Sequence, residues 1–225
     1  MNVQEATTRR LPDLKGRYLP ENCRETINSI LKETYGYEQF RNLEIYDDLS
    51  KGKEKLCISQ GQLIENVILE AEKAWKGETQ VDNILLTAPT GSGKSLLFQL
   101  PAIYLGKEYN LLTIVVSPLK ALIVDQVESL QELGYTRVAY ASSDLSPEQK
   151  MEVYRQVREG EIDLFYLSPE LLLSYDIKHF VGERRIGLVV VDEAHTVTTW
   201  GKEFRVDYWF CLLYTSPSPR DRTRS

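Results

Sequence analysis

The chain has 225 residues, enough for one α/β domain with a sizeable core and an appendage, and its formal net charge is −6. No apolar stretch approaches the roughly 18 residues that a membrane span needs, which argues against a membrane protein. The negative charge does not by itself indicate a nucleic-acid-binding protein, although a cleft on an acidic protein can be locally basic. Three widely spaced cysteines and an N-terminus without an apolar signal core predict free thiols in a reducing cytoplasm.

The first part of the chain, residues 1–55, is predicted to form a small helical extension after a polar lead-in. Apolar residues recur at helical spacing over residues 22–35, and Gly36 can end that helix. Residues 47–55 are charged and turn-like. A stronger amphipathic helix is expected at residues 62–76, at the start of a second region.

Apolar strands alternate with helices through that second region, residues 56–210. Strands are expected at residues 83–87, 112–117, 137–140, 163–167 and 186–191, and the main helices at 96–105, 120–133 and 146–159. This alternation predicts an α/β domain with a parallel sheet covered by helices on both faces. Ligands of such sheets bind beyond the carboxyl ends of the strands.

A glycine-rich turn with a lysine and a hydroxyl lies between the first of these strands and its helix, in the sequence TAPTGSGKS at residues 87–95. Backbone N–H groups at a helix N-terminus favour phosphate, and glycines let the main chain approach it closely. Lys94 would reach the β- and γ-phosphates of a nucleoside triphosphate, and the Ser95 hydroxyl would bind Mg²⁺. The residues expected to hold the nucleotide are Thr90, Gly91, Ser92, Gly93, Lys94 and Ser95.

A second acidic motif follows the last apolar strand, in the sequence DEAH at residues 192–195. Asp192 would hold Mg²⁺, and Glu193 would position and polarise the attacking water. His195 would link the γ-phosphate to the rest of the protein, although an isolated histidine here could be an ordinary surface residue. The simpler alternative for the whole motif is an acidic turn at a strand end.

Together these motifs resemble superfamily 2 helicases of the DEAH kind, and more narrowly RecQ-like helicases, over roughly residues 60–208. The segments that carry the resemblance are GSGKSLLFQLPA (91–102), VVSPLKALIVDQV (115–127), LSPEQKMEVYRQVREGEIDLFYLSPELL (145–172) and DEAHTVTTWGKEFRVDY (192–208). Trp200-Gly201 and Phe204-Arg205, soon after the acidic motif, are the features that look specifically RecQ-like.

The resemblance implies a RecA-like P-loop NTPase lobe over residues 56–210 that binds ATP, Mg²⁺ and single-stranded DNA. The full enzyme would unwind duplex DNA in the 3′ to 5′ direction with a second RecA-like lobe in cis, which this chain lacks. It would be cytoplasmic, and nucleoid-associated in a bacterium. The alternatives are another superfamily 2 translocase or RNA helicase subunit, or an ATP-dependent nucleic-acid-binding module without unwinding activity.

Candidate DNA contacts also follow from the resemblance. Ser117, Lys120 and Ser168 would contact phosphates, which positions DNA without reading its sequence. Trp200 and Phe204 would stack on bases, and core packing is the alternative for both. Arg205 would contact phosphate or the acidic motif. Lys120 could equally be a solvated helix residue.

One family feature does not align simply. RecQ-like proteins carry a phenylalanine-arginine pair and then a glutamine that reads adenine. Phe40-Arg41 fits, but Glu44 stands where the glutamine is expected. Gln62 is chosen over Gln60 as the adenine-reading residue. Either an insertion separates the two halves of the motif, or one half is a coincidence.

The last segment, residues 211–225, departs in character from the rest. Its first part, CLLYTSPSPRD, resembles the translation of a transposon-derived sequencing adapter. We therefore predict a non-native tail and native sequence up to about residue 210. A natural Ser/Pro-rich tail is the alternative.

Overall fold

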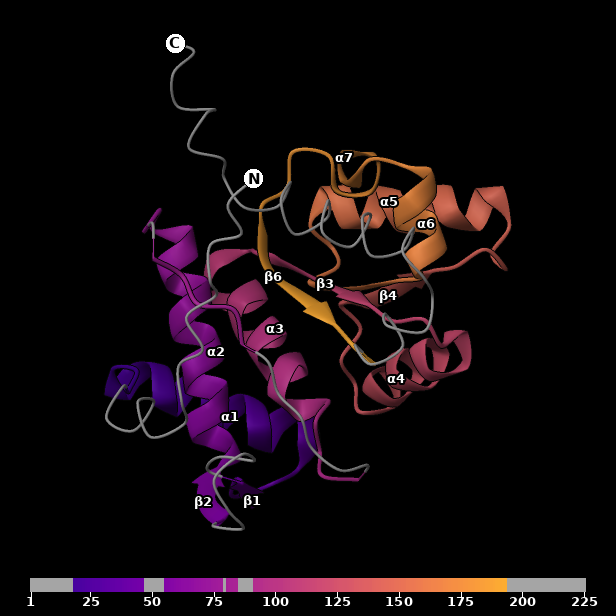
Figure 1. Ribbon diagram of the computed structural model, residues 1–225. Helices are drawn as coiled ribbons and strands as arrows, with labels where there is room; N and C mark the ends of the chain where they lie inside the picture. The colour runs from indigo at the N-terminus through magenta and orange to yellow at the C-terminus, as the bar shows by residue number, and fades with distance from the viewer. Residues whose placement is uncertain (1–17, 47–54, 79, 85–90, 194–225) are drawn as a thin grey trace. The chain divides into compact units, whose positions relative to one another are not determined.

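The computed structural model describes residues 18–46, 55–78, 80–84 and 91–193 (Figure 1). The chain divides into two compact units, residues 1–104 and 105–225. Of the strand predicted at residues 83–87, only Asn83 and Ile84 are described, so that prediction is not tested. None of the described helices is long and apolar enough to cross a membrane.

The first unit contains two amphipathic helices close to their predicted positions, α1 (Glu21–Tyr35) and α2 (Gln60–Trp75). In α1, the buried Ile27, Ile30 and Leu31 follow the i, i+3, i+4 spacing of one helix face. Gly36 ends this helix with φ 69°, a conformation that glycine adopts without steric cost. Helix α2 begins where the Ser59 hydroxyl accepts a hydrogen bond from the Gly61 N–H.

Between these helices lies an antiparallel hairpin that the sequence did not predict, formed by β1 (Asn42–Tyr46) and β2 (Lys55–Ser59). Its register pairs Asn42 with Ser59 and Tyr46 with Lys55. The extension is therefore not purely helical, and the boundary proposed between residues 55 and 56 falls at the start of β2. The division into domains at that point stays a prediction.

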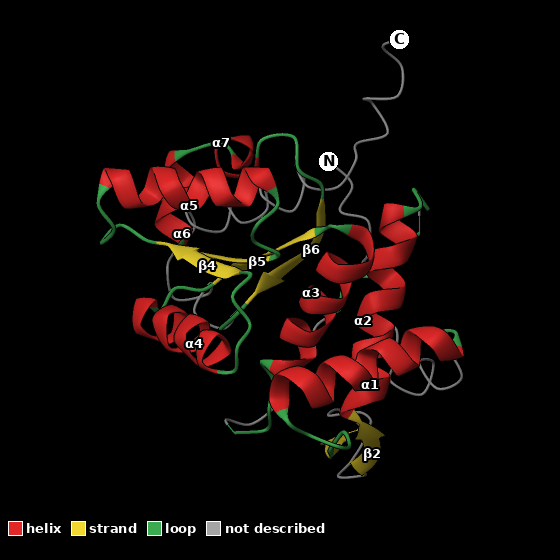
Figure 2. Cartoon of the chain, turned by 180° about the vertical axis from the view of Figure 1, so that it is seen from behind, coloured by secondary structure: helices red, strands yellow, loops and turns green. Residues whose placement is uncertain are grey.

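Helix α3 (Leu96–Tyr109) continues through Pro101 and ends in the second unit, which contains a four-stranded sheet. All its strand pairs are parallel, in the order β4-β5-β3-β6. The strands are β3 (Leu112–Val116), β4 (Val138–Ala141), β5 (Leu164–Leu167) and β6 (Ile186–Val191), and the helices after β3 are α4 (Lys120–Glu132), α5 (Pro147–Glu159), α6 (Pro169–Ser174) and α7 (Ile177–Val181). Figure 2 shows α4 on one face of the sheet and α5, α6 and α7 on the other. The predicted α/β fold is confirmed.

Each face of this sheet buries its own set of side chains because successive strand residues point to opposite sides. On the face of α5, α6 and α7, Ile114 and Phe165 belong to a buried cluster with Tyr154 and Phe180. On the face of α4, the Tyr166 hydroxyl donates to Gln126 Oε1 at 2.9 Å. Each fully buried aromatic or aliphatic side chain contributes about 1.5–3 kcal/mol to this packing.

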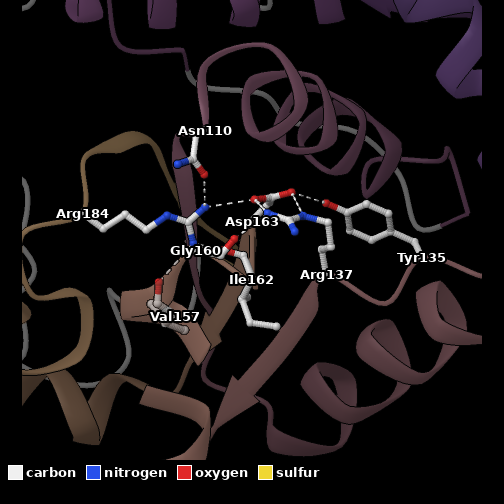
Figure 3. Close-up of polar contacts among 8 residues, drawn as sticks. All are labelled: Asn110, Tyr135, Arg137, Val157, Gly160, Ile162, Asp163 and Arg184. Atoms are coloured by element: carbon white, nitrogen blue, oxygen red, sulfur yellow. Dashed lines mark hydrogen bonds and ion pairs between the residues drawn. The ribbon is translucent and has the colours of Figure 1, made fainter. Parts of the chain in front are cut away.

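A polar cluster closes the sheet at the edge where the strands begin (Figure 3). Asp163, only 2% exposed, accepts hydrogen bonds from Arg137 Nε at 2.6 Å and from Arg184 at 2.9 Å. The Tyr135 hydroxyl donates to the same carboxylate at 3.2 Å. Arg137, Asp163 and Arg184 lie just before the first residues of β4, β5 and β6. The cluster therefore connects the amino ends of these three strands. We call it the amino-edge cluster.

Because Asp163 and Arg184 are buried, Arg184 depends on the Asp163 carboxylate to compensate its charge. The Arg184 side chain is 4% exposed, and burial lowers the pKa of its guanidinium, while the hydrogen bond to Asp163 opposes that shift. A side-chain hydrogen bond to Asp163 raises the pKa of Arg137 above its ordinary value. A Cβ added to Gly106 would lie 2.4 Å from Asp163 Cγ, so the carboxylate packs directly on the α3 backbone.

Candidate functional site

The described part of the glycine-rich loop, residues 91–95, has the geometry expected of a phosphate-binding turn. Gly91 and Gly93 have φ angles of 79° and 78°, which side chains with a Cβ rarely adopt. The carbonyls of Lys94 and Ser95 accept from N–H groups of the first turn of α3, so the loop runs directly into the helix. The Ser92 hydroxyl is buried and has no hydrogen-bond partner in the described part of the chain. Thr90 lies outside the described residues.

Gln60, in the first unit, contacts this loop. Its side chain is buried, and Nε2 donates to the carbonyls of Ser92 at 3.3 Å and Gly93 at 3.5 Å. Its Oε1 accepts from the Arg41 N–H at 3.2 Å, and its own N–H donates to the Arg41 carbonyl at 2.9 Å. The amide therefore bridges the loop and the backbone at Arg41.

The hairpin explains how Arg41 and Gln60 meet although the sequence separates them. Because Asn42 pairs with Ser59, the residues just outside the hairpin, Arg41 and Gln60, are neighbours as well. A Cβ on Gly61 would lie 2.6 Å from the Phe40 ring, so Phe40 packs against the same point. The hairpin therefore brings the Phe40-Arg41 pair next to the start of α2, and the choice between an insertion and a coincidence stays open.

Gln62, the glutamine chosen from the sequence, lies half-buried in the first turn of α2. Its carbonyl accepts a hydrogen bond from Asn66 Nδ2 at 2.7 Å. The assignment of Gln62 as the adenine-reading residue stays a prediction. The contact of Gln60 with the loop is seen only in the structure, because no local pattern separates it from Gln62.

In the second unit, β6 delivers the acidic motif at the carboxyl end of the sheet. The Asp192 N–H donates to the Val116 carbonyl at 2.9 Å, so the β3–β6 pairing continues up to this residue. Glu193 then adopts φ 49°, and its N–H donates to Asp192 Oδ1 at 2.9 Å. This left-handed turn ends the strand with two half-buried carboxylates. His195, Trp200, Phe204 and Arg205 lie outside the described residues.

Two predicted phosphate contacts, Ser117 and Ser168, lie at the same edge of the sheet. The Ser117 N–H donates to the Leu167 carbonyl, and the Ser168 N–H donates to the Ala141 carbonyl. Both side chains are at most 1% exposed, and neither hydroxyl has a hydrogen-bond partner among the described residues. Buried hydroxyls without partners are rare because they cost free energy, and these two lie at positions where phosphate contacts were predicted.

Lys120, at the start of α4, is not simply solvated. Its ammonium donates to Ser143 Oγ at 2.5 Å and Asp144 Oδ1 at 2.8 Å. The hydrogen bond from Lys120 lowers the pKa of the Asp144 carboxyl below its usual value. Asp144 was not expected from the sequence, and a phosphate would compete with it for Lys120.

Comparison with known proteins agrees with these features. A model of the DEAD/DEAH box helicase family matches residues 63–222, a range that includes most of the tail. The chain is 31% identical to the ATP-dependent DNA helicase RecQ of Haemophilus influenzae over 183 residues, which are 81% of this chain and 24% of that protein. It is 33% identical to the proteins of the same name from Synechocystis, over 82% of this chain and 32% of the relative, and from Bacillus subtilis, over 80% and 25%. The chain therefore spans only a quarter to a third of the length of these relatives.

Proposed function

We propose that this chain, which belongs to the DEAD/DEAH box helicase family, forms the ATP-binding first motor lobe of a RecQ-like DNA helicase. The complete protein would bind single-stranded and duplex DNA and unwind it from 3′ to 5′, a direction that rests on the resemblance to RecQ proteins alone. The observation that carries the proposal is the glycine-rich loop. It has two left-handed glycines, a buried Ser92 hydroxyl without a partner among the described residues, and the Gln60 amide on its carbonyls.

The residues of the two motifs take distinct roles in this proposal. The loop N–H groups and the N-terminus of α3 would hold the phosphates, and Lys94 would offset the charge of the β- and γ-phosphates. Glu193 would orient the attacking water, and its fixed left-handed backbone supports a defined direction for that carboxylate. His195 would link the γ-phosphate to the rest of the protein.

Gln60 is the better candidate for reading adenine than Gln62, because Gln60 already contacts the loop. A glutamine amide can pair with both N6 and N7 of adenine, as it does in nucleic acids. The Oε1 atom of Gln60 accepts one hydrogen bond from Arg41 and keeps a second lone pair for the adenine amino group.

The donor atoms present fit Mg²⁺. The described residues contain no group of three or more His, Cys, Asp or Glu side chains that could enclose a metal by themselves. Mg²⁺ does not need such a cage, because it is usually held by one or two carboxylates or hydroxyls together with phosphate oxygens and water. Ser95 and Asp192 would hold it, and it would supply charge neutralisation on the phosphates.

DNA would bind at the carboxyl edge of the sheet in the second unit. The buried hydroxyls of Ser117 and Ser168, which have no partner in the described part of the chain, and the ammonium of Lys120 support phosphate contacts there. Trp200 and Phe204 would stack on bases, and Arg205 would connect DNA to the acidic motif. These three residues are proposed from the family resemblance only.

The transition-state arginine of such motors comes from a second lobe, which would lie outside this chain. Residues 1–55 would form the N-terminal extension, 56–210 the lobe, and 211–225 a non-native tail. We expect the chain to bind ATP weakly and to hydrolyse it negligibly. A nucleotide record whose codons for residues 211–221 do not spell the adapter would remove the proposal about the tail.

Nucleotide binding tests the proposal directly, with fluorescent ATP and GTP analogues titrated into the 225-residue chain. Lys94→Ala should abolish binding of both. Gln60→Ala should weaken ATP more than GTP by about tenfold if Gln60 reads adenine. An equal loss for both nucleotides would mean that Gln60 only supports the loop. Gln62→Ala is the matched control, and a selective loss of ATP binding there would restore Gln62 as the reader.

The complete gene product separates unwinding from the alternatives. It should unwind a 3′-tailed DNA duplex in the presence of ATP, and Trp200→Ala should uncouple hydrolysis from DNA. Unwinding of RNA instead, or ATP-dependent binding without unwinding, would overturn the assignment to a DNA helicase.

A further inference from the structure

The outer strand of the four-stranded sheet, β4, pairs with another strand on one side only among the described residues. The carbonyls of Arg137 and Ala141 both accept from the β5 side, through Asp163 and Ser168 N–H groups. Because backbone groups alternate along a strand, the groups of Val138 and Tyr140 point away from β5. The Val138 carbonyl accepts one long hydrogen bond, from Gln131 Nε2 at 3.5 Å. Most of this outer edge of β4 is therefore open to an added strand.

A groove of about 910 Å³ runs along this edge between α4 and α5. Its floor is the backbone of β4, and its walls come from Val127, Glu128 and Gln131 on α4 and from Glu152, Val153 and Gln156 on α5. An extended peptide is the shape that fits a groove with a strand as its floor, because its N–H and C=O groups can continue the sheet. We call this the β4 groove.

The β4 groove is acidic on both walls. Glu128 lies on the α4 side, and Glu148 and Glu152 lie on the α5 side, with Glu161 near one end. The basic residue of the lining, Arg137, is already bonded to Asp163. Arg155 pairs with Glu152 and Glu161, but it also pairs with Glu159, so carboxylates outnumber it.

We propose that the β4 groove binds an extended lysine- or arginine-rich peptide of a partner protein as an additional strand next to β4. Successive side chains of an added strand point alternately toward α4 and toward α5. Since both walls carry glutamates, a continuous run of basic residues fits better than a single charged face. The same charges repel the phosphates of DNA, so this surface is separate from the nucleic-acid path proposed above.

The test uses the 225-residue chain and a fluorescein-labelled hexapeptide of alternating lysine and arginine, measured by fluorescence anisotropy at about 0.15 M salt. The double variant Glu128→Lys with Glu152→Lys should bind it at least about tenfold more weakly. The control is Glu108→Lys with Glu183→Lys, two exposed residues outside the groove, which should change affinity by less than about twofold. An equal loss in the control would overturn the proposal, because it would indicate diffuse attraction to an acidic protein.

Backbone pairing is tested separately from charge. The same peptide N-methylated at every backbone amide should lose at least about tenfold in affinity, since no N–H donor then remains on either edge to pair with β4. Tyr140→Pro removes the outward N–H of β4, at an edge position where proline is tolerated, and should weaken the unmodified peptide similarly. Undiminished binding of the fully N-methylated peptide would overturn the added-strand model. Oligo-dT that competes for the groove would overturn the assignment to a peptide.

Discussion

The two edges of the parallel sheet in the second unit have opposite characters. At the edge where the strands begin, Asp163 accepts hydrogen bonds from three side chains, and of the cluster's buried polar atoms only Arg184 Nε has no partner among the described residues. At the edge where the strands end, the buried hydroxyls of Ser117 and Ser168 have no partner there. The first edge therefore stabilises the fold through its hydrogen bonds, and the second carries the hydroxyls that we propose as phosphate contacts.

This difference follows from the parallel arrangement of the strands. All strands of a parallel sheet begin at one edge and end at the opposite edge, so residues that are far apart in sequence lie close together at each of these two edges. Helix N-termini and strand ends collect at the carboxyl edge, which is why ligands of such sheets bind there. The amino edge is free to be optimised for stability alone.

The largest effect is expected from breaking the amino-edge cluster. Asp163→Ala should lower the free energy of unfolding by about 3–5 kcal/mol, because it leaves the buried Arg184 without its carboxylate. Urea unfolding monitored by circular dichroism measures this. Asp125→Ala, which removes an exposed carboxylate from α4, is the control and should stay within about 0.5 kcal/mol. A loss below about 1 kcal/mol for Asp163→Ala would show that the cluster does not hold this edge.

Overpacking the amino-edge cluster should lower the free energy of unfolding by a smaller amount. Gly106→Ala places a Cβ 2.4 Å from Asp163 Cγ and should lower the free energy of unfolding by about 1–3 kcal/mol. In the Asp163→Ala background the same change should cost much less, because the clashing carboxylate is gone. Equal costs in both backgrounds, measured by urea unfolding, would contradict the contact.

At the carboxyl edge, removing a buried hydroxyl should raise the free energy of unfolding instead of lowering it. Ser168→Ala removes a buried hydroxyl that has no partner among the described residues and should raise the free energy of unfolding by up to about 1 kcal/mol, while weakening single-stranded DNA binding. Ser146→Ala is the matched control, because that hydroxyl accepts from the Gln149 N–H and caps α5, and its loss should cost about 1 kcal/mol. Destabilisation by Ser168→Ala would remove the contrast between the two edges.

The smallest effect concerns the exposed pair between Lys120 and Asp144. Asp144→Asn should leave the unfolding temperature unchanged, since exposed ion pairs add little stability. If Lys120 contacts phosphate, the variant should bind single-stranded DNA more tightly, by no more than about fivefold, and with a steeper salt dependence. Anisotropy titrations at several salt concentrations measure both. Unchanged DNA affinity would indicate that Lys120 serves only its pair with Asp144.

The sequence by itself determined the features that depend on neighbouring residues. The apolar periods placed α1, α2, α4 and α5 and the strands β3, β5 and β6 close to their observed positions. The glycine-rich loop and the acidic motif were identified because their spacing is local. These patterns were enough to predict the α/β class and the family resemblance.

Only the tertiary structure decided what depends on distant residues meeting. The hairpin brings Arg41 next to Gln60, and no local pattern distinguishes Gln60 from Gln62. The amino-edge cluster and the pair of Lys120 with Asp144 join residues on separate loops, so neither leaves a periodic signal in the chain. Spacing along a sequence reports which face of one element a residue occupies, whereas the partners of that residue are set by how the sheet orders its strands.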